Sequence, residues 1–468
     1  MEGVRTMTER GGAYRGWLKG RQVLVVGLAR SGVGVCRLLQ ACGARVIGTD
    51  AKSLDMLSTE VRTLGETGVT LAVGGHPVSF FEEADLVVVS PGVPLLIPPL
   101  AVARRQGTPI IGELELAYRA MEAELIAITG TNGKTTTTAL VGALLSQEPR
   151  PVLVGGNIGN PLSTHALDFP PNGLVVAEVS SFQLETIETL HPRVAAVLNL
   201  TPDHVDRHGS FEAYREAKTR VFLNQTDADW AVLNADDPEV ARFAKRTRAR
   251  VIFFSRRHPL DEGFFIREGW IVARLDGREV NIAPREEIFL RGDHNVENVL
   301  AASACAFWAG AAPSALRTAI SGFRGVEHRI EWVRELDGVA YYNDSKGTNV
   351  ASTLRALESF HEPVVLIAGG RGKGQDFAPL ATAAQGRVKV AILIGEDQAR
   401  LEAVLVPVTR VVRAPGMTEA VGLARRLAAP GDVVLLSPAC ASFDMFRDFE
   451  HRGEVFKATV LALEQHKA

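Results

Sequence analysis

The amino-acid sequence predicts an α/β protein of three domains, and three observations support this prediction. The chain has 468 residues, which is too long for one compact core and suits about three domains of roughly 100–200 residues each. Short apolar runs rich in β-branched residues recur, and each is followed by a turn and a segment of helical periodicity. These runs are nearly continuous, which is typical of parallel strands covered on both faces.

The apolar runs separate into three groups. The first group ends near a proline-rich stretch, PGVPLLIPP, and the third restarts at Val339. The second contains an alternating stretch, Phe264–Pro284, which predicts antiparallel hairpins added at the edge of a sheet. We therefore expect domains over residues 13–111, 112–325 and 326–468. The strands expected with most support are Val23–Leu28, Asp85–Ser90, Leu125–Thr129, Leu174–Ser180, Val194–Leu200, Pro363–Gly370, Val388–Gly395 and Asp432–Ser437.

Composition argues against several classes of function. Lys and Arg total 51 against 54 Asp and Glu, so the basic surplus typical of proteins that follow nucleic-acid backbones is missing. No apolar run approaches the ~18 residues that span a bilayer, and the N-terminal segment has no apolar leader region. The four cysteines form no CxxC pair, which favours a reducing compartment. We expect a cytoplasmic monomer that binds neither nucleic acid nor membranes, with its first dozen residues forming a loose extension.

A glycine-rich turn predicts a phosphate-binding loop. It follows the apolar run at Leu125–Thr129, precedes an apolar helix, and departs from the G-x-x-x-x-G-K-[ST] pattern because Ile128 occupies the first glycine position. Backbone N–H groups and the positive end of the helix converge on phosphates in such loops, Lys134 adds a charge, and the Thr135 hydroxyl suits Mg²⁺. A turn without a ligand is the plainer interpretation, which Lys134 and Thr135 at the phosphate-binding positions disfavour. The loop comprises Gly130, Thr131, Asn132, Gly133, Lys134, Thr135 and Thr136.

Three downstream residues are candidates for the surroundings of the γ-phosphate. Glu178 closes an apolar strand, which places its carboxylate at the edge of the sheet where ligands bind. His204 follows another strand, although imidazole is an unusual ligand for Mg²⁺, and a hydrogen-bonded loop histidine remains the alternative. Glu178 equally suits a salt bridge. Lys218 lies on a helix that looks amphipathic and solvated, so spacing alone does not single it out.

Six motifs run in order through nearly the whole chain: GTNGKTT, AEVSSFQLE, NLTPDHVDRHGS, GDHNVENVLAA, HRIE and NDSKGTN. Together they resemble the Mur ligase family, which builds the peptidoglycan stem peptide. GLARSG, GGNIGNP and SPACASFDMFRDFEHRGEVF resemble the branch that adds D-glutamate to UDP-N-acetylmuramoyl-L-alanine. The resemblance implies an N-terminal Rossmann-like domain for the UDP moiety, a central P-loop ATPase domain with a mostly parallel sheet, and a C-terminal Rossmann-like domain for ATP and D-glutamate.

The resemblance also implies roles for individual residues. Lys134, His204 and Lys218 would be catalytic, and two Mg²⁺ ions would be held by Thr135, Glu178, His204 and a Lys218 carbamylated by CO₂. The residues implied to bind ATP are Asn295, Asn298, His328, Arg329 and Asp344, and those implied to face D-glutamate are Lys346, Thr348, Lys373, Ser442 and Phe449. Without the resemblance, a surface lysine or a helix-capping hydroxyl would be the plainer interpretation of most of these residues.

The first domain also allows a rival function, an NAD-dependent oxidoreductase. VLVVGLARSG followed by Asp50 nearly matches a dinucleotide fingerprint, but Ala29 replaces the glycine that lets a pyrophosphate approach the backbone. The family resemblance instead implies that this domain holds UDP. The segment Ala51-Lys52 departs from the Thr-Arg common in the family, which puts individual UDP contacts in doubt. The residues implied are Arg30, Ser31, Asp50, Lys52, Ser90, Gly92 and Asn157.

The expected activity is an ATP-dependent amide ligation that adds D-glutamate to UDP-N-acetylmuramoyl-L-alanine through an acyl phosphate. Two alternatives remain open. Another amide ligase, such as a different Mur ligase or a folylpolyglutamate synthase, would share GTNGKTT, whereas the C-terminal SPACASFDMF segment discriminates better. An ATP-binding scaffold that retains only the fold is the non-enzymatic alternative, and the presence of Lys134, Glu178, His204 and Lys218 argues against it.

Overall fold

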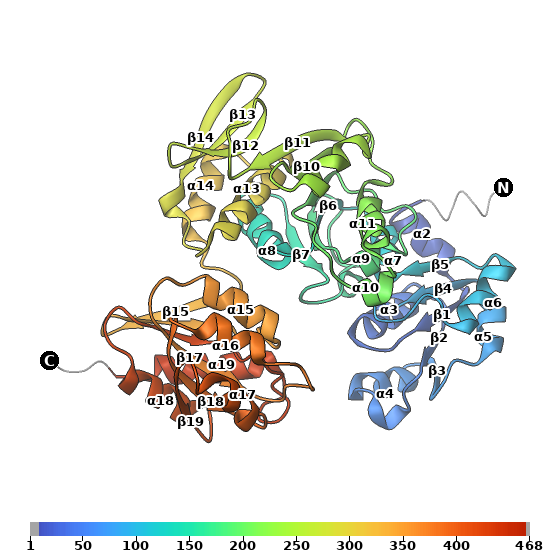
Figure 1. Cartoon of the computed structure of the whole chain (residues 1–468). Helices are drawn as coiled ribbons and strands as arrows, with labels where there is room; N and C mark the ends of the chain where they lie inside the picture. Colours follow the sequence, from blue (N-terminus) through green and yellow to red (C-terminus); the bar gives the residue numbers. More distant parts are fainter. Residues whose placement is uncertain (1–8, 465–468) are drawn as a thin grey trace. The chain divides into compact units, whose positions relative to one another are not determined.

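A computed structural model describes residues 9–464, which form three sheets of five, nine and six strands (Figure 1). The chain divides into two compact units. One unit ends at Glu287 and resumes over Val296–Ser321, and the other comprises Ile288–Asn295 and the chain from Gly322 onward. The first two sheets lie in the first unit and the third sheet lies in the second. The predicted α/β class with mostly parallel sheets is confirmed.

The N-terminal sheet has the strand order β3-β2-β1-β4-β5, and every pair in it is parallel. This order reverses direction beside β1, and ligands of open α/β sheets bind at such switch points, beyond the carboxyl ends of the strands. Its strands are β1 (Gln22–Val26), β2 (Arg45–Asp50), β3 (Thr70–Val73), β4 (Leu86–Val89) and β5 (Ile110–Gly112). Its helices are α2 (Gly12–Leu18), α3 (Arg30–Ala41), α4 (Thr59–Glu66), α5 (Val78–Glu83), α6 (Pro98–Gln106) and α7 (Glu113–Ala120), with a 3₁₀ turn at Leu54–Met56.

The segment before β1 is anchored more firmly than the sequence suggests. The guanidinium of Arg10 donates to the carbonyl of Ala123 at 2.8 Å, and the amide of Gly11 donates to the carbonyl of Arg119 at 2.8 Å. Helix α2 then begins at Gly12. The prediction of a loose extension is therefore wrong from Arg10 onward, because the segment finds backbone partners beside α7; residues 1–8 lie outside the described part of the chain.

The central sheet has the order β14-β13-β12-β11-β10-β9-β6-β8-β7. The pairs β12–β13 and β13–β14 are antiparallel and lie at one edge, as the alternation of Phe264–Pro284 predicts. Its strands are β6 (Glu124–Thr129), β7 (Val152–Gly156), β8 (Leu174–Glu178), β9 (Val194–Val197), β10 (Trp230–Asn234), β11 (Arg250–Ser255), β12 (Gly263–Arg267), β13 (Trp270–Leu275) and β14 (Arg278–Pro284). The helices that follow in the chain are α8 (Lys134–Leu145), α9 (Ser181–Leu184), α10 (Val205–His208), α11 (Phe211–Thr219), α12 (Pro238–Ala241), α13 (Asp293–Trp308) and α14 (Pro313–Gly322), with 3₁₀ turns at Leu162–Thr164, Arg220–Phe222, Arg242–Lys245 and Arg285–Glu287.

The C-terminal sheet has the order β15-β16-β20-β17-β18-β19. The sequence analysis predicted neither β15 nor β19, the two edge strands. Strand β15 pairs antiparallel with β16, whereas the remaining pairs are parallel. Alternate residues of β17 face two separate hydrophobic clusters, Leu366 with α15 to α17 and Val365 with α18 and α19, so helices cover both faces. The elements are β15 (Glu331–Leu336), β16 (Val339–Asn343), β17 (Val364–Gly369), β18 (Val388–Ile394), β19 (Arg410–Arg413), β20 (Val433–Leu436), α15 (Val350–Glu358), α16 (Ala378–Ala384), α17 (Gln398–Leu405), α18 (Met417–Leu427) and α19 (Phe449–Leu461).

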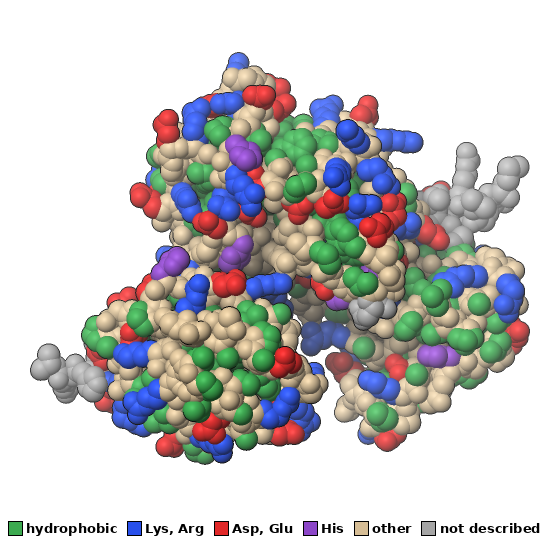
Figure 2. Space-filling view, in the orientation of Figure 1, with side chains coloured by type: hydrophobic (Ala, Val, Ile, Leu, Met, Phe, Trp, Pro, Cys, Tyr) green, Lys and Arg blue, Asp and Glu red, His purple; other side chains and the backbone are tan. Residues whose placement is uncertain are grey.

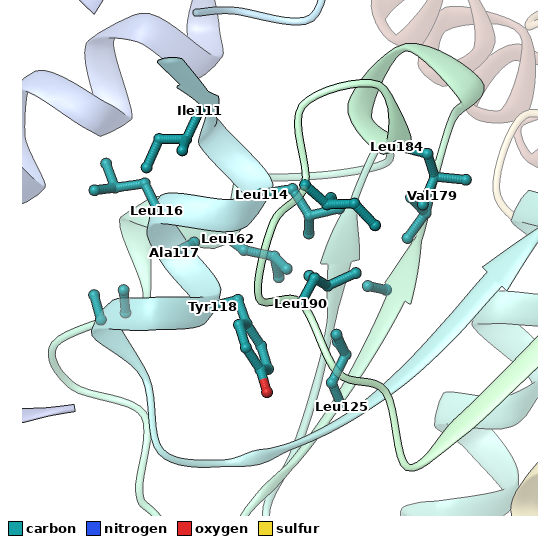
Figure 3. Close-up of a cluster of buried hydrophobic side chains, with 14 of the residues drawn as sticks. Ile111, Leu114, Leu116, Ala117, Tyr118, Leu125, Leu162, Val179, Leu184 and Leu190 are labelled. Carbon is teal, nitrogen blue, oxygen red and sulfur yellow. The ribbon is translucent and has the colours of Figure 1, made fainter. Parts of the chain in front are cut away.

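A continuous hydrophobic cluster joins the first two sheets through helix α7. All eight residues of α7 are buried, and Figure 3 shows Leu114, Ala117 and Tyr118 of this helix close to side chains of the central domain, among them Leu162 and Leu190. A buried carboxylate must find donors in such a setting. Glu115 of α7 does so, because it accepts from the amide of Leu190 at 3.0 Å and from the Arg119 guanidinium at 2.7 Å.

Charged side chains of both signs are interspersed over the face shown in Figure 2, consistent with the balanced composition. Within residues 9–464, no helix combines the length and the apolar character needed to cross a bilayer.

Candidate active site

The predicted phosphate-binding loop joins β6 to α8, and its backbone requires glycine at both ends. Gly130 has φ +149° and Gly133 has φ +81°, and a Cβ at Gly133 would lie 2.3 Å from Oδ1 of Asn298. Asn199 braces the loop from the end of β9, because its Oδ1 accepts from the amide of Asn132 at 2.8 Å and its Nδ2 donates to the carbonyl of Asn132 at 3.1 Å. The loop is therefore shaped by glycine geometry and fixed by a neighbouring strand end.

The ammonium group of Lys134 folds back over its own loop. Its Nζ donates to the carbonyl of Gly130 at 2.9 Å and to the carbonyl of Thr131 at 2.8 Å. The charge thus lies beside the backbone N–H groups at the start of α8, where a helix terminus attracts anions. Its role as a phosphate ligand stays a prediction.

Glu178 contacts two other residues that the sequence analysis singled out. It is the last residue of β8 and is 3% exposed. The hydroxyl of Thr135 donates to its Oε2 at 2.7 Å, and Nδ2 of Asn157 donates to its Oε1 at 2.9 Å. A hydroxyl and a carboxylate in contact at a phosphate-binding loop are the oxygen ligands that Mg²⁺ prefers, so this pair fits a magnesium ion. Asn157, which the resemblance implies binds the substrate, therefore hydrogen-bonds to the same carboxylate as Thr135.

His204 lies in the left-handed region, with φ 51°, at the start of α10. Its side chain is exposed, its Nε2 lies 3.6 Å from Oδ2 of Asp203, and its ring centroid lies 4.8 Å from that of Phe182. Among the described residues, no three His, Cys, Asp or Glu side chains form a group able to hold a metal ion. The magnesium ligands that the family resemblance implies therefore stay a prediction.

Lys218 is buried, although its helix looks amphipathic and solvated in the sequence. Its side chain is 1% exposed, and its Nζ donates to the carbonyl of Gly130 at 2.9 Å and to the hydroxyl of Thr129 at 3.2 Å. Burial, reinforced by the nearby charge of Lys134, lowers the pKa of Lys218 well below its ordinary value. Lys218 and Lys134 thus share one loop carbonyl, and Lys218 presents an amine that is readily neutral.

Two residues around this loop were missed by the sequence analysis, Asn199 and Tyr214. The Tyr214 hydroxyl lies 3.1 Å from that of Thr131, and its ring centroid lies 4.8 Å from Nζ of Lys218. Burial raises the pKa of Tyr214 to about 12, so the phenol stays protonated. The signal available in the sequence was spacing, because Tyr214 precedes Lys218 by one helical turn on α11 and Asn199 follows β9 at the carboxyl edge of the sheet.

Several residues implied to bind UDP also hold the first loop of the N-terminal sheet together. Asp50 accepts from the amide of Leu28 at 2.8 Å through Oδ2 and from the amide of Lys52 at 2.9 Å through Oδ1. The Ser90 hydroxyl donates to the carbonyl of Gly27 at 2.7 Å, and the Arg30 guanidinium donates to the carbonyl of Gly159 at 3.4 Å. Asp50 and Ser90 thus contact the loop after β1, and Arg30 links the start of α3 to the segment after β7. The contacts of all the implied residues with UDP, Ser31, Lys52 and Gly92 included, remain predictions.

Replacement of Gly32 with alanine is expected to destabilise this loop. A Cβ there would lie 2.0 Å from the carbonyl oxygen of Gly27, and backbone cannot move aside as a flexible side chain does. We expect Gly32→Ala to lower the free energy of unfolding by roughly 2 kcal/mol or more and to raise the KM for the UDP-linked substrate. Gly16→Ala is the matched control, since nothing lies within 4 Å of its Cβ in α2. Equal thermal unfolding of the two variants would contradict this account.

The C-terminal unit places four predicted residues on loops that follow the carboxyl ends of its strands, and a fifth at the start of α19. Lys346 and Thr348 follow β16, Lys373 follows β17, Ser442 follows β20, and Phe449 begins α19. Nζ of Lys346 lies 5.6 Å from the ring centroid of Phe449, and Nζ of Lys373 lies 5.6 Å from that of Phe443. Two cations are thus paired with aromatic rings at the loops predicted to meet a dianionic amino acid, and their contacts with it stay predictions.

The residues implied to bind ATP are divided between the two units. Asn298, in the first unit, accepts from the Thr137 hydroxyl at 3.3 Å, whereas Asn295, in the second, donates to the carbonyl of Arg291 at 2.6 Å. His328 is buried with its Nδ1 2.9 Å from Nδ2 of Asn343, and Arg329 beside it is exposed. Burial lowers the pKa of His328, so its imidazole is neutral near pH 7.

The burial of Asp344 should make the stability of the C-terminal unit depend on pH. Burial raises its pKa from 3.8 to about 7, although the Ser437 hydroxyl donates to it at 2.7 Å. The folded state therefore binds the proton more tightly than the unfolded state. As pH rises from the unfolded pKa of 3.8 to the folded pKa of about 7, the free energy of unfolding falls by about 1.4 kcal/mol for each pKa unit, and above that range it levels off. Denaturation at pH 5 and pH 8 should show this loss in the wild type and a smaller loss in Asp344→Asn; equal losses would contradict it.

Comparison with known proteins decides the family. Three domain families match: the Mur ligase MurD-like N-terminal domain over residues 21–112, the Mur ligase middle domain over 128–306, and the Mur ligase glutamate ligase domain over 328–440. The UDP-N-acetylmuramoylalanine–D-glutamate ligase of Pelotomaculum thermopropionicum is 49% identical over 451 residues, covering 95% of this chain and 98% of that protein. The chain belongs to the Mur ligase family. The ligase of the same name from Koribacter versatilis is 48% identical to this Mur ligase over 96% of the chain and 99% of the relative.

Solved structures show the same fold at low sequence identity. A UDP-N-acetylmuramate-alanine ligase from Thermotoga maritima matches this Mur ligase with a TM-score of 0.58 and 19% identity, covering 94% of this chain and 99% of that one. A MurF ligase from the same organism, solved in complex with ADP, matches with a TM-score of 0.55 and 15% identity, covering 97% and 99%. The match to the glutamate ligase domain ends at residue 440, before Ser442 and Phe449.

Proposed function

We propose that this Mur ligase uses ATP to join D-glutamate to UDP-N-acetylmuramoyl-L-alanine, a step of peptidoglycan precursor synthesis in the cytoplasm. The observation that carries the proposal is similarity over almost the whole chain, 49% over 451 residues, to a ligase of that name. The phosphate-binding loop supports it independently, because Lys134 and Lys218 both donate to the carbonyl of Gly130 and the neighbouring Thr135 donates to Glu178.

In the proposed reaction, the L-alanine carboxylate attacks the γ-phosphorus of ATP, ADP leaves, and an acyl phosphate forms. The deprotonated amine of D-glutamate then attacks the acyl carbon, and the tetrahedral intermediate expels inorganic phosphate to leave an amide. The protein contributes mainly position and charge. Lys134 and the N–H groups of its loop stabilise the transferring phosphoryl group, and Asn157 orients the acceptor beside Glu178.

We further propose that Thr135, Glu178 and His204 hold Mg²⁺, two ions in all, together with a carbamate on Lys218. When bound, Mg²⁺ neutralises charge on the phosphates. Carbamate formation requires a neutral amine, whose nitrogen adds to CO₂ with loss of a proton. Burial lowers the pKa of Lys218 and so favours the neutral amine, and the carbamate would supply anionic oxygen ligands.

An assay of amino acids and acceptors tests the proposal. The protein is incubated with ATP, Mg²⁺ and each acceptor, and the amide product is identified by mass spectrometry. We expect a product with UDP-N-acetylmuramoyl-L-alanine and D-glutamate, and at least about 100-fold less with L-glutamate, because a chiral site built from opposed polar groups rejects the mirror arrangement. A preference for L-glutamate, or use of a folate acceptor, would overturn the assignment.

A further inference from the structure

Arg452 is a fully buried arginine near the start of helix α19, with 0% of its surface exposed. Its guanidinium makes three hydrogen bonds. Nε donates to the Ser345 hydroxyl at 2.9 Å, Nη2 donates to the Ser345 carbonyl at 2.7 Å, and Nη1 donates to the Cys440 carbonyl at 3.0 Å. The Ser345 hydroxyl in turn donates to the carbonyl of Phe449 at 2.8 Å. A planar fork of five N–H donors makes such a multiple contact, which a lysine cannot reproduce.

These bonds connect three segments that carry the residues proposed to face D-glutamate. Ser345 directly precedes Lys346, Cys440 lies two residues before Ser442, and Phe449 begins the helix that carries Arg452. The loop after β16 and the loop after β20 are therefore joined through one side chain. A shift of either loop would stretch the hydrogen bonds of Arg452 to the other.

The charge of Arg452 is not neutralised by its hydrogen-bond partners. All three acceptors are neutral oxygen atoms of Ser345 and Cys440. Burial lowers the pKa of Arg452 to about 10, which leaves the guanidinium charged at neutral pH, and Asp344 and Asp444 act on it only as neighbouring charges. A buried cation without a directly bonded carboxylate is costly for folding alone, but it favours an anion bound at the adjacent loops.

We propose that Arg452 is a positioning residue for the incoming amino acid: it fixes the loops after β16 and β20 relative to each other, and its charge favours the carboxylates of the substrate. This inference rests on the proposed function for the identity of the amino acid. The fixing of the two loops is a property of the chain itself. Arg452 does not itself contact ATP or the amino acid; it acts through its hydrogen bonds to Ser345 and Cys440.

The test compares Arg452→Lys and Arg452→Gln with the wild type in two measurements. Steady-state kinetics give KM and kcat for each substrate, and hydrogen exchange gives the amide exchange rates of residues 344–348 and 440–445. We expect Arg452→Lys to raise the KM for D-glutamate about 10-fold and Arg452→Gln to raise it further, because lysine keeps the charge without the fork. The KM for UDP-N-acetylmuramoyl-L-alanine should stay within about twofold, and both segments should exchange faster.

Glu454→Gln is the control, since Glu454 is exposed on the same helix. Unchanged exchange in both segments of a folded Arg452→Lys protein would overturn the proposal, as would an equal rise in the KM for all substrates. If Arg452→Gln does not fold, Arg452→Lys decides the outcome. A wild-type protein that does not use D-glutamate would contradict the proposed function, while the exchange rates would still decide whether Arg452 fixes the loops.

Discussion

Replacement of Lys134 with alanine should abolish ligation, lowering turnover by about 1,000-fold or more, because it removes the positive charge at the start of α8, where the phosphates are proposed to bind. Its Nζ lies against the carbonyls of Gly130 and Thr131, within the loop whose N–H groups are proposed to receive the phosphates. Lys218 shares the Gly130 carbonyl but is buried beneath the loop. Coupled phosphate release with all three substrates measures the effect.

The loss must be separated from unfolding and from general charge effects. Circular dichroism and thermal unfolding of Lys134→Ala should match the wild type, because the side chain contacts its own loop. Lys245→Ala, an exposed lysine on a 3₁₀ turn of the same unit, should retain full turnover. Wild-type turnover by Lys134→Ala would defeat the assignment of this loop as a phosphate site.

Replacement of Lys218 with alanine should lower turnover by a comparable factor of about 1,000, and short carboxylates such as formate or acetate should restore part of it. The physical reason is the proposed carbamate. Alanine leaves a buried space beside Thr129 and Gly130 that a small carboxylate can enter, and there it supplies the oxygen ligands that the modified lysine would supply.

Lys218→Met is the matched control, because methionine fills most of the volume of the lysine side chain and leaves no room for an added carboxylate. We expect the same loss of turnover in this variant and no rescue. Wild-type turnover by Lys218→Ala without added carboxylate would refute the carbamate role, and equal rescue of both variants would show that the carboxylate acts elsewhere.

The parts of the fold that the sequence predicted are those with strong local signals. The predicted apolar runs form β1, β4, β6, β8, β9, β17, β18 and β20. They could be predicted because strands buried on both faces have nearly continuous apolar sequences, unlike segments exposed to solvent. Strand β15 was missed because it lies at an edge, where its residues Glu331–Leu336 are mostly half-exposed and carry charge. The anchoring of Arg10 was missed because it depends on partners over 100 residues away, such as Ala123.

The candidate site shows a similar division. The phosphate-binding loop was predicted from spacing, because its glycines and Lys134 have local physical reasons for their positions. The burial of Lys218 was not predictable, since it follows from packing of α11 against the Thr129–Gly130 turn. Arg452 was equally hidden within a charged stretch of α19, and only the meeting of two distant loops shows what it contacts.

The measurement that tests the central claim most directly is coupled phosphate release with the wild-type protein, ATP, Mg²⁺, UDP-N-acetylmuramoyl-L-alanine and D-glutamate. We predict that sustained release requires all three substrates and matches the amide product mole for mole, because the acyl phosphate gives up its phosphate only when the amine attacks. Phosphate release that continues at the same rate without D-glutamate, or that is driven equally by L-glutamate, would contradict the account.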